Sequence, residues 1–197
     1  MADVLSSKAE QVLKRVKDRD IARLIASGDA SATEDFVRAH YQSVYRFMRH
    51  LTRQVEDSED LTQQAFIRAK ERIGSYRGQA SLRTWLHKVA FHEYTHWKRA
   101  RRRTSRLDHA TPYWEAGFDA CVESAVLAEA LAHLPEHQRT AFLLSEVQEL
   151  SIAEAAQVMM VPQATFKSRL FKARKHLCSL MTERKETTLE TRNALEP

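Results

Sequence analysis

The chain has 197 residues, of which 43% are hydrophobic and 29% charged, and its formal net charge is +5. This length allows one medium domain or two small ones, and four Gly and four Pro are too few for the turns of a sheet protein. Two isolated cysteines, Cys121 and Cys178, exclude a disulfide framework, and no apolar stretch reaches the ~20 residues of a membrane span.

The N-terminal part of the chain is predicted to be helical. Residues 1–19 form a charged lead-in to a short apolar pattern, which ends at Gly28 and Asp29. Ser31 followed by Glu34 matches a capping box, so a new helix is expected to begin there.

A third helix, SEDLTQQAFIRAKERI, is expected to be capped by Asp57. Two of the chain's glycines fall within 74–80, which predicts a loop. Ser81 restarts a long amphipathic helix, whose apolar residues recur at helical spacing as far as Trp97. That helix ends in a basic run at 98–106.

Residues 105–123 lose the apolar period and contain proline and glycine, so they are predicted to be a linker. A helical domain is expected over 124–182, with a capping box at Ser151 and Glu154. A short helix, a tight turn and a final helix that is apolar on one face and basic on the other match the helix-turn-helix pattern. The apolar face is expected to contain Phe166, Leu170, Ala173, Leu177 and Leu180. The tail, 183–197, has too few apolar residues to pack and is predicted to be disordered.

Basic residues gather in two segments, 98–106 and 167–175. Clustered positive charge indicates a polyanionic partner such as nucleic acid, and two solvated helix faces are the alternative. The second segment surrounds Phe171, which the helical period places on the basic face. An exposed aromatic ring among hydrogen-bond donors favours DNA reading, since an apolar group can contact a thymine methyl.

The segment LAHLPEHQRTAFLLSEVQELSIAEAAQVMMVPQATFKSRLFKARKHL resembles the C-terminal domain of bacterial sigma factors. Their pattern there is roughly LxxLPxxxRxxxxL followed by LSxxEIAxxLGxPxGTVKSRLxRARxxL. The resemblance implies that the last helix recognises the minus-thirty-five promoter element. The residues that it assigns to this contact are Thr165, Lys167, Ser168, Arg169, Phe171, Lys172 and Arg174. Met160 and Ala164 stand where the family usually has glycine, which leaves the turn geometry open.

Residues 20–104 resemble the N-terminal domain of small sigma factors of the extracytoplasmic-function (ECF) type. SEDLTQQAFIRAKERI is similar to the family's EDLxQxxFL helix, which binds the clamp helices of the largest polymerase subunit. By position, the implied polymerase contacts are Asp60, Leu61, Gln63, Gln64 and Phe66. Packing inside the domain is the alternative for the apolar members, above all for Leu61.

SYRGQASLRTWLHKVAFHEYTHWKRARRR is similar to the family's promoter-melting region. The resemblance implies that the loop 76–80 takes up a base flipped out of the stack, while basic residues hold the displaced strand. The residues assigned to the minus-ten element and to melting are Tyr76, Arg77, Gly78, Gln79, Ser81, Trp85, Lys88, His92, Lys98, Arg99, Arg101, Arg102 and Arg103. His92 stands where the family commonly has Asn, so its effect on base preference is left open.

The sequence HEYTH at 92–96 also matches the H-E-x-x-H motif of zinc proteases. Both histidines fall on one side of the helix, but Glu93 lies in the apolar stripe and no third ligand is evident. A zinc metallohydrolase is therefore kept only as an alternative. A second alternative is a stand-alone helix-turn-helix regulator, which would need the second domain alone.

Together these patterns predict an all-α protein with two small helical domains joined by a flexible linker. The predicted parts are an N-terminal extension (1–19), the first domain (20–104), the linker (105–123), the second domain (124–182) and the tail (183–197). The isolated cysteines predict a cytoplasmic location, and the lack of a long apolar stretch predicts no membrane insertion. The resemblance implies a non-enzymatic sigma factor, for which no cofactor and no metal are expected. Its implied partners are core RNA polymerase, promoter DNA and an anti-sigma factor.

Overall fold

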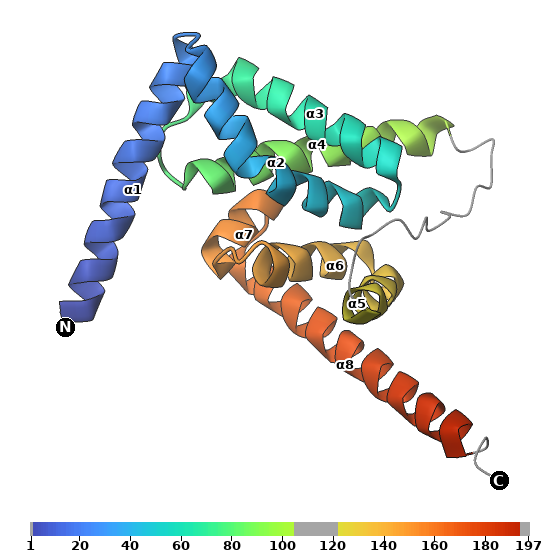
Figure 1. Cartoon of the computed structure of the whole chain (residues 1–197). Coiled ribbons are helices and arrows are strands. Elements are labelled where there is room, and N and C mark those ends of the chain that lie inside the picture. The colour runs from blue at the N-terminus through green and yellow to red at the C-terminus, as the bar shows by residue number, and fades with distance from the viewer. Residues whose placement is uncertain (1, 105–121, 194–197) are drawn as a thin grey trace. The chain divides into compact units, whose positions relative to one another are not determined.

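The computed structural model describes residues 2–104 and 122–193, and every regular element in these two ranges is a helix (Figure 1). The chain divides into two compact units, the first built mainly from α1–α4 and the second mainly from α5–α8. This all-helical, two-unit architecture confirms the predicted fold class. Most of the predicted linker lies outside the described residues.

The first unit contains α1 (Ala2–Ala26), α2 (Ala30–Thr52), α3 (Val55–Arg72), the short 3-10 helix η1 (Ile73–Ser75) and α4 (Leu82–Thr104). Helix α3 packs against both α2 and α4, while α1 contacts α2, α4 and η1 (Figure 1). The core between them is apolar, because each helix turns one stripe of residues inward. Its fully buried members include Val44, Phe47, Met48, Ala65, Ala69, Leu86 and Ala90.

Two helices of this unit begin at other residues than the sequence predicts. Helix α2 starts at Ala30, because the side chain of Asp29, not Ser31, accepts the capping hydrogen bond, from the backbone N–H of Ala32 at 2.8 Å. Helix α3 starts at Val55, so Asp57 lies in its first turn instead of capping it. A carboxylate in that turn still favours the helix dipole.

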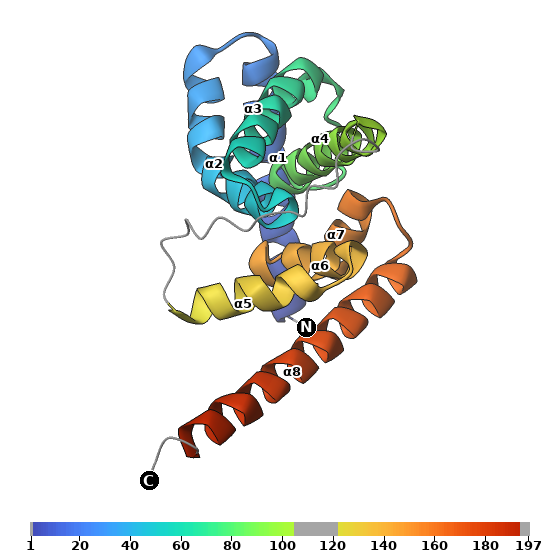
Figure 2. The same ribbon diagram turned by 90° about the vertical axis from the view of Figure 1, so that its right-hand side faces the viewer.

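The second unit contains α5 (Val122–His133), α6 (Glu136–Phe142), the π-helical segment η2 (Leu143–Val147), α7 (Ile152–Met159) and α8 (Gln163–Asn193). Helix α8 packs against α6 and α5, as Figure 2 shows. The capping box at α7 is confirmed. Glu154 Oε2 accepts from the Ser151 backbone N–H at 3.1 Å, and Ser151 Oγ accepts from the Glu154 N–H at 3.3 Å.

Helix α8 has the predicted apolar stripe, since Phe166, Leu170, Ala173 and Leu177 are all buried and Leu180 is half-buried. Its end differs from the prediction. The helix continues to Asn193, which corrects the predicted disorder over 183–193. Glu, Lys and Arg dominate this segment and favour helix, and extending an existing helix avoids the cost of nucleation. Residues 194–197 lie outside the described residues.

The domain limits also shift slightly at the other ends. Helix α5 begins at Val122, within the predicted linker 105–123. Helix α1 covers the predicted lead-in 1–19 from Ala2 onward. The loop predicted at 74–80 begins as η1 and continues without regular structure up to Ser81.

Candidate nucleic-acid and polymerase interfaces

The turn between α7 and α8 orients the second helix of the helix-turn-helix. Met160 has a φ of +54°, so it takes the left-handed conformation that glycine adopts at least cost. The backbone N–H of Val161 donates to Ala156 O at 3.0 Å and closes the end of α7. The turn therefore keeps the geometry of a glycine turn although it has methionine. Ala164 lies within α8, where a positive φ is not needed.

The outer face of α8 carries polar donors around an exposed ring. Lys167, Ser168 and Lys172 are exposed, and the Phe171 side chain is 69% exposed. The opposite face of α8 is packed on the domain core, so these side chains face solvent. Packing within the domain therefore does not explain why an aromatic residue stands at position 171. Donors that flank an apolar group suit contact with base edges and phosphates.

One residue at this face was missed by the sequence analysis. His137, near the start of α6, lines a shallow hollow together with Thr165, Ser168, Arg169 and Lys172 of α8. Burial, Arg169 and Lys172 lower the pKa of His137 below its usual 6.5. Nothing in the helical period singles this histidine out, because it comes next to α8 only through the packing of α6 on α8.

Arg174, which the resemblance assigns to DNA, has a partner inside the domain. Its guanidinium Nη2 donates to Glu146 Oε1 of η2 and forms an ion pair with it. The bond connects α8 to η2. Arg174 therefore contributes to the shape of the domain at the edge of the polar face.

In the first unit, the residues assigned to the minus-ten element divide into inward and outward groups. Tyr76 is buried: its hydroxyl donates to Ala80 O at 2.7 Å, and its ring meets Trp85 edge-on with centroids 5.8 Å apart. Burial raises the pKa of Tyr76 to about 12. By contrast, Arg77 and Gln79 are exposed. We define residues 76–81 as the α4 loop, in which Tyr76 sets the shape and the outward side chains are available to a ligand.

The structure confirms that the helix restarts at Ser81, directly before α4 begins at Leu82. Ser81 Oγ accepts a hydrogen bond from the Thr84 backbone N–H at 3.1 Å, as an N-cap does. Lys88, two turns into α4, is exposed, and Trp85 is half-buried beside Tyr76.

The basic end of α4 is partly built into the fold. Arg101 lies over the Trp97 ring at 5.1 Å from its centroid and donates to Asp57 Oδ2 at 2.6 Å, while Lys98 lies 6.0 Å from the Tyr94 ring. The remaining assigned residues of this run, Arg99, Arg102 and Arg103, are exposed. They form an outward set of cations at the end of one helix.

The HEYTH segment places its two histidines together. The ring centroids of His92 and His96 are 4.4 Å apart. Glu93 lies between His92, at 3.5 Å, and Arg68 of α3, at 4.0 Å, which makes it part of a charged network between two helices. Within residues 2–104 and 122–193, no cluster of three His, Cys, Asp or Glu side chains suited to a metal ion is found.

The five residues of α3 that are assigned to polymerase binding differ in burial. Asp60, Gln63 and Gln64 are exposed, but Leu61 is only 5% exposed and packs in the core. This burial favours the alternative for Leu61, packing inside the domain, and its side chain is not part of the outer surface. Phe66 is half-buried and packs edge-on against Phe36, with centroids 6.0 Å apart.

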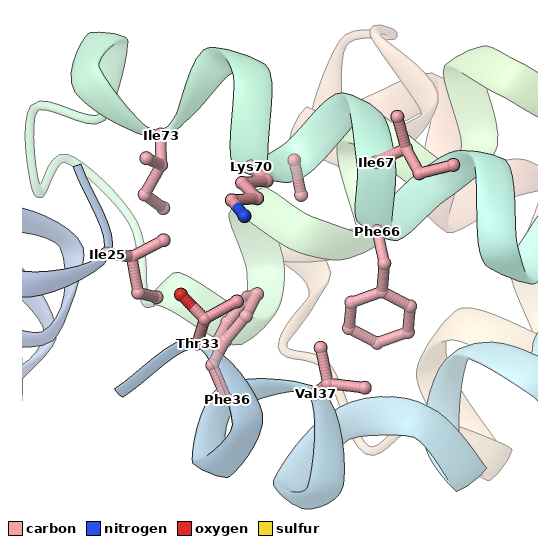
Figure 3. Close-up of a pocket in the computed structure, with 9 residues that line it drawn as sticks. Ile25, Thr33, Phe36, Val37, Phe66, Ile67, Lys70 and Ile73 are labelled. Carbon is pink, nitrogen blue, oxygen red and sulfur yellow. The ribbon is translucent and has the colours of Figure 1, made fainter. Parts of the chain in front are cut away.

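Phe66 also borders an apolar groove between α3 and α2. Figure 3 shows its ring facing Val37, with Phe36 and Ile25 further along the groove. Ile67, on the next position of α3, is exposed beside it. The polar row of α3 and this groove are therefore neighbouring parts of one face of the first unit.

Comparison with known protein families finds matches in both units. Residues 36–104 match the family model described as sigma-70 region 2, and residues 124–177 match sigma-70 region 4. The chain is 33% identical over 170 residues to the ECF RNA polymerase sigma factor SigM of Mycobacterium tuberculosis, covering 83% of this chain and 86% of that protein. It is 28% identical over 162 residues to the RNA polymerase sigma factor YlaC of Bacillus subtilis, covering 78% and 94%.

Two solved structures share the fold. The structure of CnrH in complex with the cytosolic domain of CnrY has a TM-score of 0.66 at 24% identity and covers 84% of this chain and 97% of that one. The sigma factor RpoE of Bartonella quintana, solved with the anti-sigma factor NepR, has a TM-score of 0.67 at 21% identity, covering 76% and 96%.

Proposed function

This chain belongs to the ECF RNA polymerase sigma factors, and we propose how its two domains divide the work of promoter recognition. As a sigma factor it is a non-enzymatic subunit that binds core RNA polymerase and directs it to promoters. This membership replaces both alternatives, the zinc metallohydrolase and the stand-alone regulator.

We propose that the second domain reads the minus-thirty-five element with the outer face of α8. The observation that carries this assignment is the exposed ring of Phe171 among Lys167, Ser168 and Lys172, on the helix face opposite the packed stripe. Thr165 and Arg169 border the same face, and His137 of α6 adds a donor at its edge. A helix presented in this way fits the major groove.

In the first domain, the proposed polymerase contact consists of Asp60, Gln63 and Gln64 of α3, extended by the apolar groove beside Phe66. An apolar patch next to a polar row is the usual composition of a protein interface. Leu61 supports this surface from beneath, since it packs in the core.

The α4 loop and the basic end of α4 are proposed to open the duplex at the minus-ten element. Gln79 and Arg77 are exposed on a loop whose shape is held by the buried Tyr76, so their side chains meet an unstacked base without reordering. Arg99, Arg102 and Arg103 then hold the phosphates of the displaced strand. Lys88 and His92 lie between these two parts on α4.

We further propose that the protein acts in the cytoplasm and is controlled by an anti-sigma protein. The solved sigma factor RpoE, which has the same fold, was captured with an anti-sigma factor, and CnrH was captured with a cytosolic domain of CnrY. Among the described residues, none of the helices has the length and apolar character needed to cross a membrane.

Run-off transcription with core polymerase on a promoter library tests the proposal directly. We expect the chain to start transcripts from templates that share two elements, and to bind them strongly in a gel shift only with core enzyme. Strong, specific DNA binding by the free chain would contradict the proposed division of labour.

A further inference from the structure

The C-terminal half of α1 contacts the α4 loop and the first residue of α4. Asp18 Oδ2 accepts a hydrogen bond from the backbone N–H of Leu82, the first residue of α4, at 2.8 Å. Arg19 Nη2 donates to the backbone carbonyl of Arg77 at 3.0 Å. Adjacent residues of one helix therefore hold both ends of the loop.

A third contact involves Gly78 at the tip of the loop. Its φ is +70°, and a Cβ built on it would meet Arg19 Nε at 2.3 Å. A side chain here would be strained by the backbone conformation and would also displace the guanidinium. Arg19 thus lies on the bare Cα of Gly78, and glycine is the residue that allows both the turn and the contact.

These contacts complete the closure of the loop. From inside, the Tyr76 hydroxyl binds Ala80 O at 2.7 Å, and Ser81 caps α4 through Thr84. From outside, α1 holds the carbonyl of Arg77 and the N–H of Leu82. The side chain of Gln79 remains exposed.

We propose that Asp18 and Arg19 are positioning residues for promoter opening, which hold the α4 loop in the shape that receives the unstacked base. The inference rests on the proposed role of that loop at the minus-ten element. Both residues precede the match to sigma-70 region 2, which begins at residue 36. If the loop is already ordered before DNA binds, no binding free energy is lost in ordering it.

The first test measures the brace itself in the free, full-length chain by hydrogen exchange. Asp18→Ala and Arg19→Ala are expected to speed exchange of the Leu82 amide and of the α4 loop by about fivefold, the effect of losing one helix cap. Arg23→Ala is the matched control. It removes the same charge from the same helix one turn later, where the side chain is 79% exposed and pairs with Asp20.

The second test measures promoter opening with core polymerase, by permanganate reactivity of minus-ten thymines. Asp18→Ala and Arg19→Ala are expected to slow opening about fivefold and to weaken discrimination among single-base variants of the minus-ten element. Affinity for core polymerase is expected to stay unchanged, which separates loop positioning from general loss of structure. Arg19→Lys keeps a donor and is expected to restore part of the discrimination.

A double-mutant cycle tests the contact between Arg19 and Gly78. Gly78→Ala alone is expected to impair opening, through both strain and collision with the guanidinium. In the Arg19→Ala background the collision is absent, so Gly78→Ala is expected to cost less. Strictly additive effects would overturn the proposed contact.

Gln79→Ala distinguishes this inference from the proposed function on which it rests. If Gln79→Ala leaves minus-ten discrimination unchanged, the proposed base contact of the loop is wrong. If Gln79→Ala changes discrimination while Asp18→Ala and Arg19→Ala match the parent in opening and discrimination, the positioning role is overturned and the proposed function stands.

Discussion

Arg101 near the end of α4 donates a hydrogen bond from Nη1 to Asp57 Oδ2 in the first turn of α3, at 2.6 Å. The same guanidinium lies over the Trp97 ring. Arg101, which the resemblance assigns to DNA contact, therefore also links α4 to α3. The basic run 98–103 is therefore not a uniform row of phosphate contacts.

Arg101→Ala is expected to lower the free energy of unfolding by about 1 kcal/mol, because it removes a partly exposed ion pair and a cation–π contact. Arg102→Ala, on an exposed position of the same run, is expected to leave stability unchanged. Urea denaturation of both variants measures the difference. In DNA binding, Arg102→Ala should reduce the salt slope by about 1, and an equal loss of stability in the two variants would contradict the assignment.

Lys167→Ala combined with Lys172→Ala is expected to weaken minus-thirty-five recognition by about tenfold or more, since a good base contact contributes ~1–3 kcal/mol. Transcription from promoters with intact and scrambled minus-thirty-five elements measures this loss. Core polymerase binding should be unchanged, because both lysines lie on the outer face of α8. A parallel loss of polymerase binding would count against the separation of the two surfaces.

Asp60→Ala combined with Gln64→Ala is expected to weaken core binding without affecting stability, since both side chains are exposed on α3. Leu61→Ala is expected to lower stability, and to affect core binding only as a consequence of that loss. It removes a buried side chain and should cost about 2–5 kcal/mol of unfolding free energy. Fluorescence binding to core enzyme and thermal denaturation separate the two effects; a stable Leu61→Ala variant with poor core binding would restore Leu61 as a surface contact.

His137 is expected to make minus-thirty-five binding depend on pH. In the free chain, burial, Arg169 and Lys172 hold its pKa below 6.5, so it is neutral near pH 7. DNA phosphates nearby would raise that pKa, so binding takes up a proton and weakens as pH rises through the pKa of the DNA-bound histidine. Binding titrations across this range should lose the dependence in His137→Gln.

The same lowered pKa has a consequence of opposite sign for folding. The unfolded chain binds more protons than the folded chain between the lowered pKa and 6.5. The contribution of His137 to stability is therefore complete above about pH 6.5 and is lost as pH falls below it. For the DNA-binding prediction, a His137→Gln variant that keeps the pH dependence of the parent chain would show that His137 does not lie in the interface.

Met160→Gly is expected to stabilise the second domain by about 1 kcal/mol, because it relieves a left-handed backbone conformation at a side chain that is 59% exposed. Met160→Ala is the matched control. It removes the same side chain but keeps the unfavourable φ, so no gain is expected. Thermal denaturation compares the three chains, and equal stability of the Gly and Ala variants would contradict the explanation.

The sequence by itself determined what depends on neighbours within about one helical turn. The apolar stripe of α8, the capping box at Ser151 and Glu154 and the restart of the helix at Ser81 were all predicted, because each depends on residues three or four apart. Local prediction erred where two residues compete for one role. Asp29 lies two positions before Ser31, and only the backbone geometry shows which of them caps α2.

Only the tertiary structure decided which distant polar groups form hydrogen bonds and which side chains are occupied by contacts within the fold. Asp18 and Leu82 are 64 residues apart, Arg19 and Arg77 are 58 apart, and Arg101 and Asp57 are 44 apart. A linear pattern assigns a charge to a helix face, but it does not say which other helix covers that face. Helix packing brings these groups within hydrogen-bond distance, because it satisfies apolar burial along the whole helix and fixes the register of the polar residues at its ends.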